Sequence, residues 1–277
     1  MNRINLEFSE NFTNNDIYFI EVVSDQIIIN DNYDGIFILD SDCNIIKRLK
    51  LLDDLTIDVS FIKDREIVLY CYENRCLIHI DIDSYSYNII FLSTDMKDII
   101  FFSLYEWVDN NLVLLADSGR IFVHVNLLDN LVQVVQKDTI NKFHFSIYKN
   151  WSKLNKFIIH KVYPQKFEAV VESDNVIKLM NYKNDTESIL KIEPFETEPF
   201  YYHDIEVTTD CVVQISERQV SIWYVGKNIR LYPNSQDYSF LRGRIISIDD
   251  TNYLLLLVCS NSEPEQVTIE KYSFSTL

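Results

Sequence analysis

The segment DQIIINDNYDGIFIL, residues 25–39, leads from an Asp-bearing turn into two short apolar runs. Asp34-Gly35, between the runs, is a strong hairpin signal. An Asp- or Asn-bearing turn that leads into an apolar run recurs at Asp25, Asp64, Asn110, Asn155, Asp210 and Asp250. Successive turns are 39, 46, 45, 55 and 40 residues apart. A period of about 40 to 50 residues, with several short strands in each, is typical of a β-propeller.

We therefore predict an all-β chain that forms a single β-propeller over residues 1–277, with six blades of four strands. In the first repeat we expect strands at Ile17–Val23, Gln26–Asn30, Ile36–Leu39 and Ile45–Leu51. The last repeat shows only three strands, and the alternating segment Ile4–Phe8 is expected to supply the fourth and close the ring. The predicted blades are residues 16–54, 55–95, 96–139, 140–185, 186–235, and 236–277 with 3–8.

Other β folds are alternatives to this prediction. Seven blades of about 40 residues each would also fit the chain length, and a β-sandwich or a two-domain β protein would also contain short strands. The number of visible turns favours six blades. Runs such as Ile27–Ile29 and Leu254–Leu257 are apolar on both faces of a strand, which suits a blade that lies between two others.

The charge balance restricts the possible partners. The chain has 25 basic and 42 acidic residues, a net charge of −17, and its pI is near 4.6. Such a field repels nucleic-acid backbones and anionic membranes, so we expect no direct binding to either. It attracts basic proteins and speeds their association, although acidity also serves plain solubility.

The cysteines and the sequence ends indicate a cytoplasmic protein. Five cysteines occur, at Cys43, Cys71, Cys76, Cys211 and Cys259, and no C-x-x-C pair is present. Most lie in or beside apolar runs, so we expect small buried hydrophobic residues rather than disulfides or metal ligands. Residues 1–5 lack the apolar stretch of a signal peptide, and the run 254–259 is too short to span a bilayer. Reduced thiols favour the cytoplasm.

No established catalytic or metal-binding motif is present, so we expect no enzyme, no cofactor and no metal. His79 and His124 occupy matching places in neighbouring repeats, which predicts packing between blades. Paired carboxylates such as Asp53-Asp54 are common in so acidic a chain, and most of them are solvated turns. The stretch from Asn30 to Gly35 lacks the closing Glu of a calcium loop and is interpreted as a hairpin.

The segment from Asp185 to Tyr202 accounts for the longest interval and is predicted to be an inserted loop. It contains two Glu-Pro-Phe tripeptides, and rigid aromatic anchors among charges are what a binding loop uses. The alternative is that Phe195 and Phe200 only pack the loop onto the ring. The predicted partner-binding residues share the insertion's face: Glu193, Phe195, Glu196, Glu198, Phe200, Tyr201, Tyr202, Asp53, Asp54, Glu263 and Glu265.

In its Asn-, Ile- and Asp-rich composition, its acidity and its lack of catalytic motifs, the chain resembles the immunity proteins of bacterial contact-dependent growth inhibition and related polymorphic toxin systems. The resemblance implies a cytoplasmic protein that binds a cationic nuclease toxin domain and covers its active site. No residue role is carried over, because the likeness includes no motif. The alternatives are a propeller hydrolase or lyase acting on a carbohydrate, and a scaffold subunit of a larger complex.

Overall fold

The computed structural model describes residues 3–13, 16–96, 99–116, 121–135, 158–159, 167–173, 176–181, 186–191, 204–207, 211–224, 227–249, 251–263 and 266–275. Within them the chain forms β-strands and one short 3-10 helix, η1 (Thr94–Met96). No helix of this part of the chain has the length and apolarity needed to cross a membrane. The all-β prediction is confirmed.

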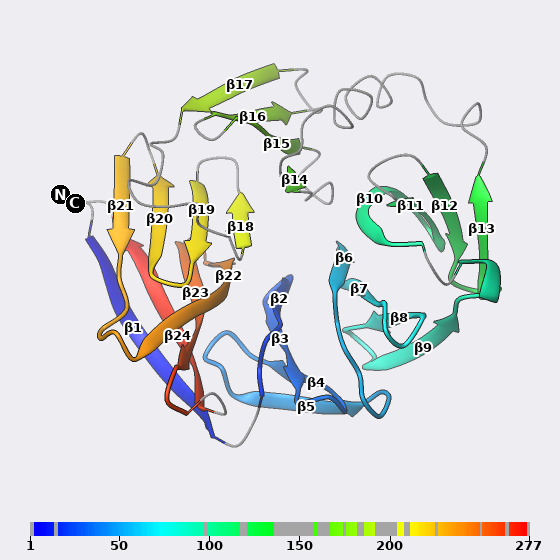
Figure 1. The fold of residues 1–277 in the computed structure, drawn as a ribbon, viewed down its shortest axis with the longest axis horizontal. Coiled ribbons are helices and arrows are strands. Elements are labelled where there is room, and N and C mark those ends of the chain that lie inside the picture. The colour runs from blue at the N-terminus through cyan, green and yellow to red at the C-terminus, as the bar shows by residue number, and fades with distance from the viewer. Residues whose placement is uncertain are drawn as a thin grey trace. The chain divides into compact units, whose positions relative to one another are not determined.

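The described strands form six antiparallel sheets of four strands (Figure 1). One compact unit, the first unit, comprises residues 1–55 and 195–277, and the second unit comprises residues 56–194. The sheets of the first unit contain β2 (Ile20–Val23), β3 (Gln26–Asp31), β4 (Gly35–Leu39) and β5 (Ile45–Lys50); β18 (Asp204–Val207), β19 (Cys211–Ser216), β20 (Gln219–Tyr224) and β21 (Lys227–Leu231); and β22 (Tyr238–Ile248), β23 (Thr251–Ser260), β24 (Gln266–Ser275) and β1 (Arg3–Thr13).

The second unit contains the other three sheets. They are made of β6 (Val59–Lys63), β7 (Glu66–Cys71), β8 (Cys76–Asp81) and β9 (Ser86–Phe91); β10 (Phe101–Val108), β11 (Asn111–Ala116), β12 (Ile121–Asn126) and β13 (Leu131–Val135); and β14 (Ile158–Ile159), β15 (Phe167–Ser173), β16 (Val176–Asn181) and β17 (Thr186–Lys191). Apart from the last sheet, each sheet uses four strands that are consecutive in the chain. This is the up-and-down order of propeller blades.

The last sheet contains the first strand of the chain. Its order is β22, β23, β24, β1, and β1 runs antiparallel to β24 from Arg3 opposite Ser275 to Thr13 opposite Gln266. The predicted N-terminal strand is therefore confirmed, and it is longer than the predicted segment. β1 pairs with the backbone N–H and C=O groups that β24 would otherwise expose, and it becomes the outer strand of this sheet.

Burial follows the position of a strand in its sheet. The middle strands β3 and β4 bury all their side chains except that of Gln26, which is partly buried. The outer strand β5 exposes all of its side chains except that of Leu49. Apolar residues on both faces of the middle strands confirm the predicted two-sided pattern. The exposed Lys and Arg side chains of β5 discourage another chain from pairing with this edge.

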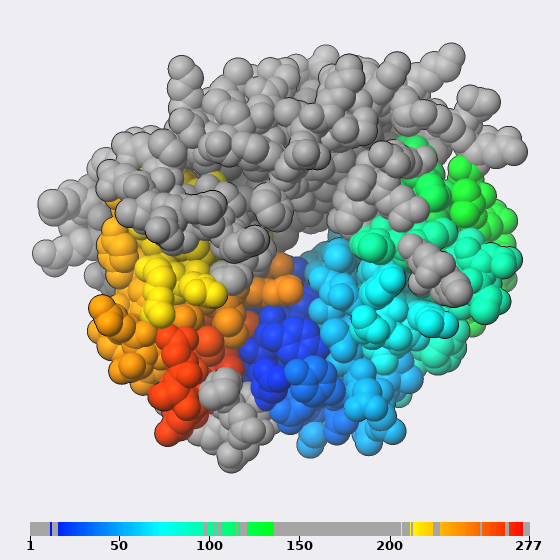
Figure 2. Space-filling model, in the orientation of Figure 1, coloured from blue at the N-terminus to red at the C-terminus, as the bar shows by residue number. Residues whose placement is uncertain are grey.

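The run Leu254–Leu257 of β23 shows why both faces are apolar. Leu255 and Leu257 belong to a buried cluster shared with the sheet of β2 to β5, whereas Leu254 and Leu256 pack with the sheet of β18 to β21. The last sheet thus lies between two other sheets of the first unit. Figure 2 shows the blue segment of the first sheet and the orange and red segments of the last sheet in contact.

The fourth sheet departs from the prediction. For the blade at residues 140–185 the apolar pattern predicts residues 156–163 as the second strand. They overlap β14, which is the first strand of the sheet, and each later strand moves one place accordingly. The outer strand is β17, so the first part of the predicted insertion is a strand and not a loop. The sequence TESILK combines a short apolar pair with charged and polar residues, as IIKRLK of the outer strand β5 does, and that was the missed signal. The turn predicted at Asn155 lies outside the described residues.

Gly35 supports the first hairpin in a way that the sequence did not predict. In the turn of this hairpin, it is Asn32 that adopts a left-handed backbone conformation, with a φ of 48°, a conformation that glycine often supplies in hairpins. Gly35 instead lies where β5 approaches closely: an added Cβ would overlap the carbonyl oxygen of Leu49 and lie 3.0 Å from the Leu51 nitrogen. Both obstacles are backbone atoms, which have little freedom to move.

We expect Gly35→Ala to lower the free energy of unfolding by about 1–3 kcal/mol, because the added methyl group overpacks the contact between β4 and β5. Urea unfolding followed by circular dichroism measures this change. Glu73→Ala, an exposed change in a turn of the second sheet, is the control and is expected to stay within about 0.5 kcal/mol. Equal stability of the two variants would contradict the role given to Gly35.

Candidate functional site

The candidate site lies on one end of the sheets, which we call the turn face. Since the strands of each sheet alternate in direction, the turn between the second and third strands lies at the same end as the connection to the next sheet. The turn face therefore carries every such turn and connection of a unit. In the first unit these include Asp31–Gly35, the residues after β5, the turn from β19 to β20, and residues 232–237.

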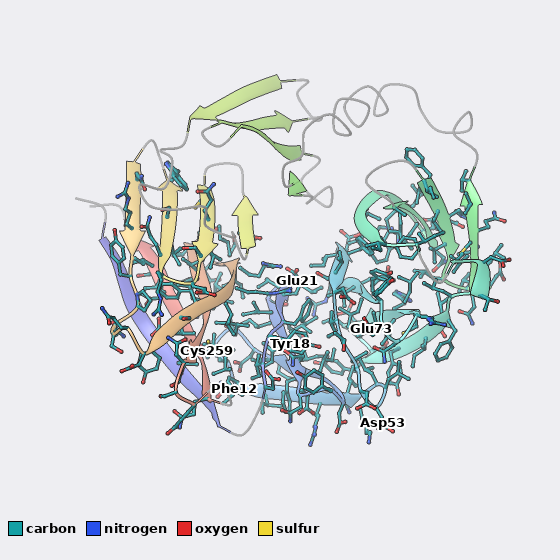
Figure 3. The ribbon with its side chains drawn as sticks, viewed as in Figure 1. Phe12, Tyr18, Glu21, Asp53, Glu73 and Cys259 are labelled. Carbon is teal, nitrogen blue, oxygen red and sulfur yellow. The ribbon has the colours of Figure 1, made fainter. Side chains whose placement is uncertain are left out.

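Most of the predicted partner-binding residues lie outside the described residues: Glu193, Phe195, Glu196, Glu198, Phe200, Tyr201, Tyr202 and Glu265. The structure describes Asp53, Asp54 and Glu263, and all three are exposed on the turn face of the first unit. Asp53, which is labelled in Figure 3, forms an ion pair with Lys50, and its Oδ1 lies 3.1 Å from Lys50 Nζ. The oxygen of Glu263 accepts a hydrogen bond from Gln266.

An open groove of about 610 Å³ lies on the same face, and sequence reasoning missed it. Its lining residues are Arg218, Tyr232, Pro233, Ser235, Gln236 and Asp237. Arg218 belongs to the turn between β19 and β20, and the others form the connection from β21 to β22. The string Pro-Asn-Ser marks a turn, but no pattern in the sequence indicates that these side chains border one groove.

Hydrogen bonds hold the groove's backbone in place. The Gln236 carbonyl accepts bonds from Arg218 Nη1 at 2.7 Å and from Asn261 Nδ2 at 3.0 Å. The Asn261 N–H donates to the Asp237 carbonyl at 2.6 Å, and the Phe240 N–H donates to the Glu217 carbonyl at 3.0 Å. The connection is therefore fixed to the turns of two sheets, and its exposed side chains project from a rigid base.

The turn of the first hairpin is fixed in a similar way. The buried Asn30 accepts hydrogen bonds at Oδ1 from the backbone of Tyr18 and Phe19, both at 2.9 Å, and donates from Nδ2 to Asp16 and Asn32. The stretch from Asn30 to Gly35 forms the predicted hairpin between β3 and β4.

Across the described residues, no group of three or more His, Cys, Asp and Glu is placed to hold a metal ion.

A buried charge cluster joins the first strands of three sheets in the first unit. Arg244 of β22 donates from Nε to Glu21 of β2 at 2.9 Å, and Glu206 of β18 lies 4.0 Å from the same nitrogen. Glu21 is labelled in Figure 3. The side chains of Arg244, Glu21 and Glu206 are 10%, 4% and 3% exposed. Carboxylates buried in an ion pair are not presented to a polymer substrate, so we assign the cluster a structural role.

We expect Arg244→Met to lower the free energy of unfolding by about 3–5 kcal/mol, because two buried carboxylates would lose their cation. The exposed pair of Arg65 and Asp83 provides the control, and Arg65→Met is expected to cost less than about 1 kcal/mol. Urea unfolding measures both. If the two losses are equal, the buried cluster does not stabilise the first unit in the way described.

The two matching histidines pack as the sequence predicts in one case. The ring of His79 on β8 meets Trp107 of the neighbouring sheet edge to face, with ring centroids 6.3 Å apart. His79 Nε2 is buried without a hydrogen-bond partner, and Glu66 Oε1 lies 3.8 Å away. His124 differs, since its Nε2 lies 3.0 Å from Asn111 Oδ1 on its own sheet. None of the five cysteines forms a disulfide in the described part of the chain, and all but Cys259 are buried, as expected of small buried hydrophobic residues.

Burial lowers the pKa of His79 below its ordinary value and raises the pKa of Glu66 above its own. Below about pH 6.5 the unfolded chain protonates His79 more readily than the folded protein does, so this residue reduces stability as the pH falls. Glu66 acts with the opposite sign, because it binds a proton more tightly when folded. We expect stability to fall less between pH 7.5 and 5.5 in His79→Gln than in wild type.

Urea midpoints at the two pH values measure this dependence. In Glu66→Gln the opposing contribution is removed, so the loss at pH 5.5 is expected to be larger than in wild type. A pH dependence unchanged in His79→Gln would contradict the assignment to His79.

The second unit carries a different surface feature. Phe91 on β9, Leu128 after β12 and Val134 on β13 are 65%, 73% and 55% exposed. Asn88 of β9 donates to the Leu127 carbonyl at 3.2 Å, which brings the outer edges of these two sheets together. Large exposed apolar side chains are a feature of protein-interaction surfaces when they form a contiguous patch.

Comparisons with known proteins establish the fold. No family model and no curated protein matches the chain. The chain is similar to the β-propeller domain of Cps50 (Swd1) from Myceliophteria thermophila, with 9% identity, 99% and 100% of the two chains covered and a TM-score of 0.58. A chain of the mitotic checkpoint complex gives 10% identity, 99% and 94% coverage and a TM-score of 0.57.

The chain is also similar to a catalytically inactive virginiamycin B lyase from Staphylococcus aureus, whose structure was solved with quinupristin. Its identity is 10%, 99% of this chain and 100% of the lyase chain are covered, and the TM-score is 0.56. These likenesses show that the chain is a β-propeller, as the turn spacing predicts. At such low identity they show the fold alone, and the fold is shared by an enzyme and by a subunit of a protein complex.

Proposed function

We propose that this protein is a cytoplasmic, non-enzymatic binding module, an immunity protein that neutralises a basic nuclease-type toxin domain by covering its active site. One observation supports the proposal above the others: exposed carboxylates, among them Asp53, Asp54 and Glu263, lie on the turn face of the first unit, in a chain of net charge −17. A nuclease presents Lys and Arg to the phosphate backbone that it cleaves, and an acidic face matches such a surface.

Electrostatic attraction and packed anchors would act at different stages of binding. Long-range attraction raises the association rate, and desolvated aromatic contacts slow the release of the partner. The similar chain of the mitotic checkpoint complex belongs to a protein assembly, which agrees with a protein partner for this chain. The sequence between β17 and β18 contains two Glu-Pro-Phe tripeptides, at 193–195 and 198–200, which would add charge and aromatic area to a binding surface.

The test is a pull-down from native host lysate with the protein as bait. We expect one basic protein to be retained at about 0.1 M salt and released at about 1 M salt, where screening is nearly complete. Glu193/Glu196/Glu198→Lys is expected to abolish retention. The control Asp25/Asp129/Asp249→Lys makes the same charge change in turns at the opposite end of the strands and is expected to retain the partner. The recovered protein's nuclease activity should fall on stoichiometric addition of the bait.

Other outcomes favour the other candidate functions. Retention that salt does not weaken, and that Leu128→Glu abolishes, favours a scaffold subunit that uses the exposed apolar side chains of the second unit. This candidate is supported by the 65% and 73% exposure of Phe91 and Leu128. If no basic protein is retained, the immunity proposal is wrong, and a polysaccharide-binding screen then tests the hydrolase or lyase alternative.

A further inference from the structure

We propose that the groove of Arg218, Tyr232, Pro233, Ser235, Gln236 and Asp237 binds an extended Lys- or Arg-bearing segment of a basic protein partner. The inference rests on the proposed function and specifies its chemistry, since it names a site and a ligand class that the sequence did not predict. The volume of about 610 Å³ lies within the ordinary range of ligand pockets. Its open shape suits a chain segment that continues beyond both ends of the groove.

The charges around the groove favour a cationic ligand. Asp237 of the lining is exposed, and among the described residues it takes part in no ion pair. Glu217 and Glu263 are exposed in the two turns that hold the connection through Arg218 and Asn261. The one cation of the lining, Arg218, already donates from Nη1 to the carbonyls of Gln236 and Tyr238, at 2.7 and 3.1 Å. Its guanidinium is directed at the loop's own backbone and keeps its charge, and the three carboxylates outnumber this single cation.

The aromatic residues supply the contact area. Tyr232 is 59% exposed and Tyr238 is 40% exposed, and Pro233 lies between them in the chain. A tyrosine ring accepts a Lys or Arg cation over its face and packs against the methylene stem of the side chain. A ligand with alternating cationic and small residues would therefore satisfy both the rings and the carboxylates.

The rigidity of the loop lowers the cost of binding. Gln236 and Asp237 are bonded through their carbonyls to Arg218 and Asn261, and the Asp237 N–H donates to Ser235 Oγ at 3.1 Å. Asn261, which bonds to both of these residues, is held in turn by the Ser239 hydroxyl, which donates to Asn261 Oδ1 at 2.8 Å. A loop that is already ordered loses little conformational entropy when a ligand binds.

The experiment is fluorescence anisotropy of the full chain with a fluorescein-labelled peptide of ten alternating Arg and Gly residues. Tyr232→Ala and Asp237→Lys are both exposed changes and are each expected to raise Kd about tenfold, the loss of one well-packed or charge-paired anchor. Tyr87→Ala and Asp129→Lys repeat the two changes on exposed residues of the second unit. These controls are expected to leave Kd within about twofold of wild type.

The matched pairs make each outcome decisive for the groove. Equal weakening by Asp237→Lys and Asp129→Lys would show that the peptide responds only to net charge, and would overturn the proposal. A peptide with Glu in place of Arg that bound equally well would overturn it too, as would absence of binding by the Arg peptide. Circular dichroism of each variant confirms that the fold is kept.

The pull-down separates failure of the groove from failure of the proposed function. If Asp237→Lys still retains the basic partner from lysate while Glu193/Glu196/Glu198→Lys does not, the protein binds its partner elsewhere on the turn face, and only the groove assignment is wrong. If no basic partner is retained but the Arg peptide binds with the expected variant pattern, the groove assignment stands and the nuclease-inhibitor function fails.

Discussion

The antiparallel pairing of β1 with β24 is the contact on which the last sheet depends. It joins residues 3–13 to residues 266–275, so the chain forms it only after both segments have been brought together, and long-range pairing carries an entropic cost. Apolar burial offsets that cost on both faces of the sheet, through Leu255 and Leu257 on one side and Leu254 and Leu256 on the other. Directional polar contacts add to this packing: Arg244 bonds to Glu21, and Lys271 donates to the Ser41 carbonyl at 2.7 Å. Both tie the last sheet to the first.

The turn face is built on the same division between apolar packing and directional contacts. Strand interiors bury aliphatic side chains, whereas the turns and connections bind to one another through Asn, Arg and backbone groups. Asn32 accepts from the Asp16 N–H and Asn74 accepts from the Thr56 N–H, so two sheets hold the incoming connection with the same residue type. In the last sheet Asn261 holds the incoming connection, because its side chain and its backbone N–H donate to the carbonyls of Gln236 and Asp237. This repeated bracing fixes the connections to the sheets, and ordered loops on a rigid scaffold are suited to recognition.

The regularity of the fold determined how much the sequence could predict. Five sheets follow the predicted order because each short apolar run is bounded by a turn, and the alternating segment after Met1 indicated the strand that completes the last sheet. The fourth sheet was misassigned because the apolar run at residues 156–163 suits a first or a second strand equally well, and Thr186–Lys191 carries the charges of an outer strand. Gly35 was interpreted as a turn residue, but its role is set by the backbone of Leu49, a tertiary neighbour. The groove was missed for the same reason, because Arg218 and Gln236 meet only through the packing of two sheets.

Charge and rigidity lead to different requirements for a partner. A net charge of −17 acts over a distance of about a Debye length and selects by sign alone. The braced groove acts only at contact, where Tyr232 and Asp237 of its lining select by shape and charge. A basic partner attracted by the field would be bound weakly without such a site, because exposed ion pairs contribute little. A groove without the field would capture its ligand slowly. The two features on the turn face of the first unit are therefore complementary, and together they suit a protein that must capture a basic partner quickly and release it slowly.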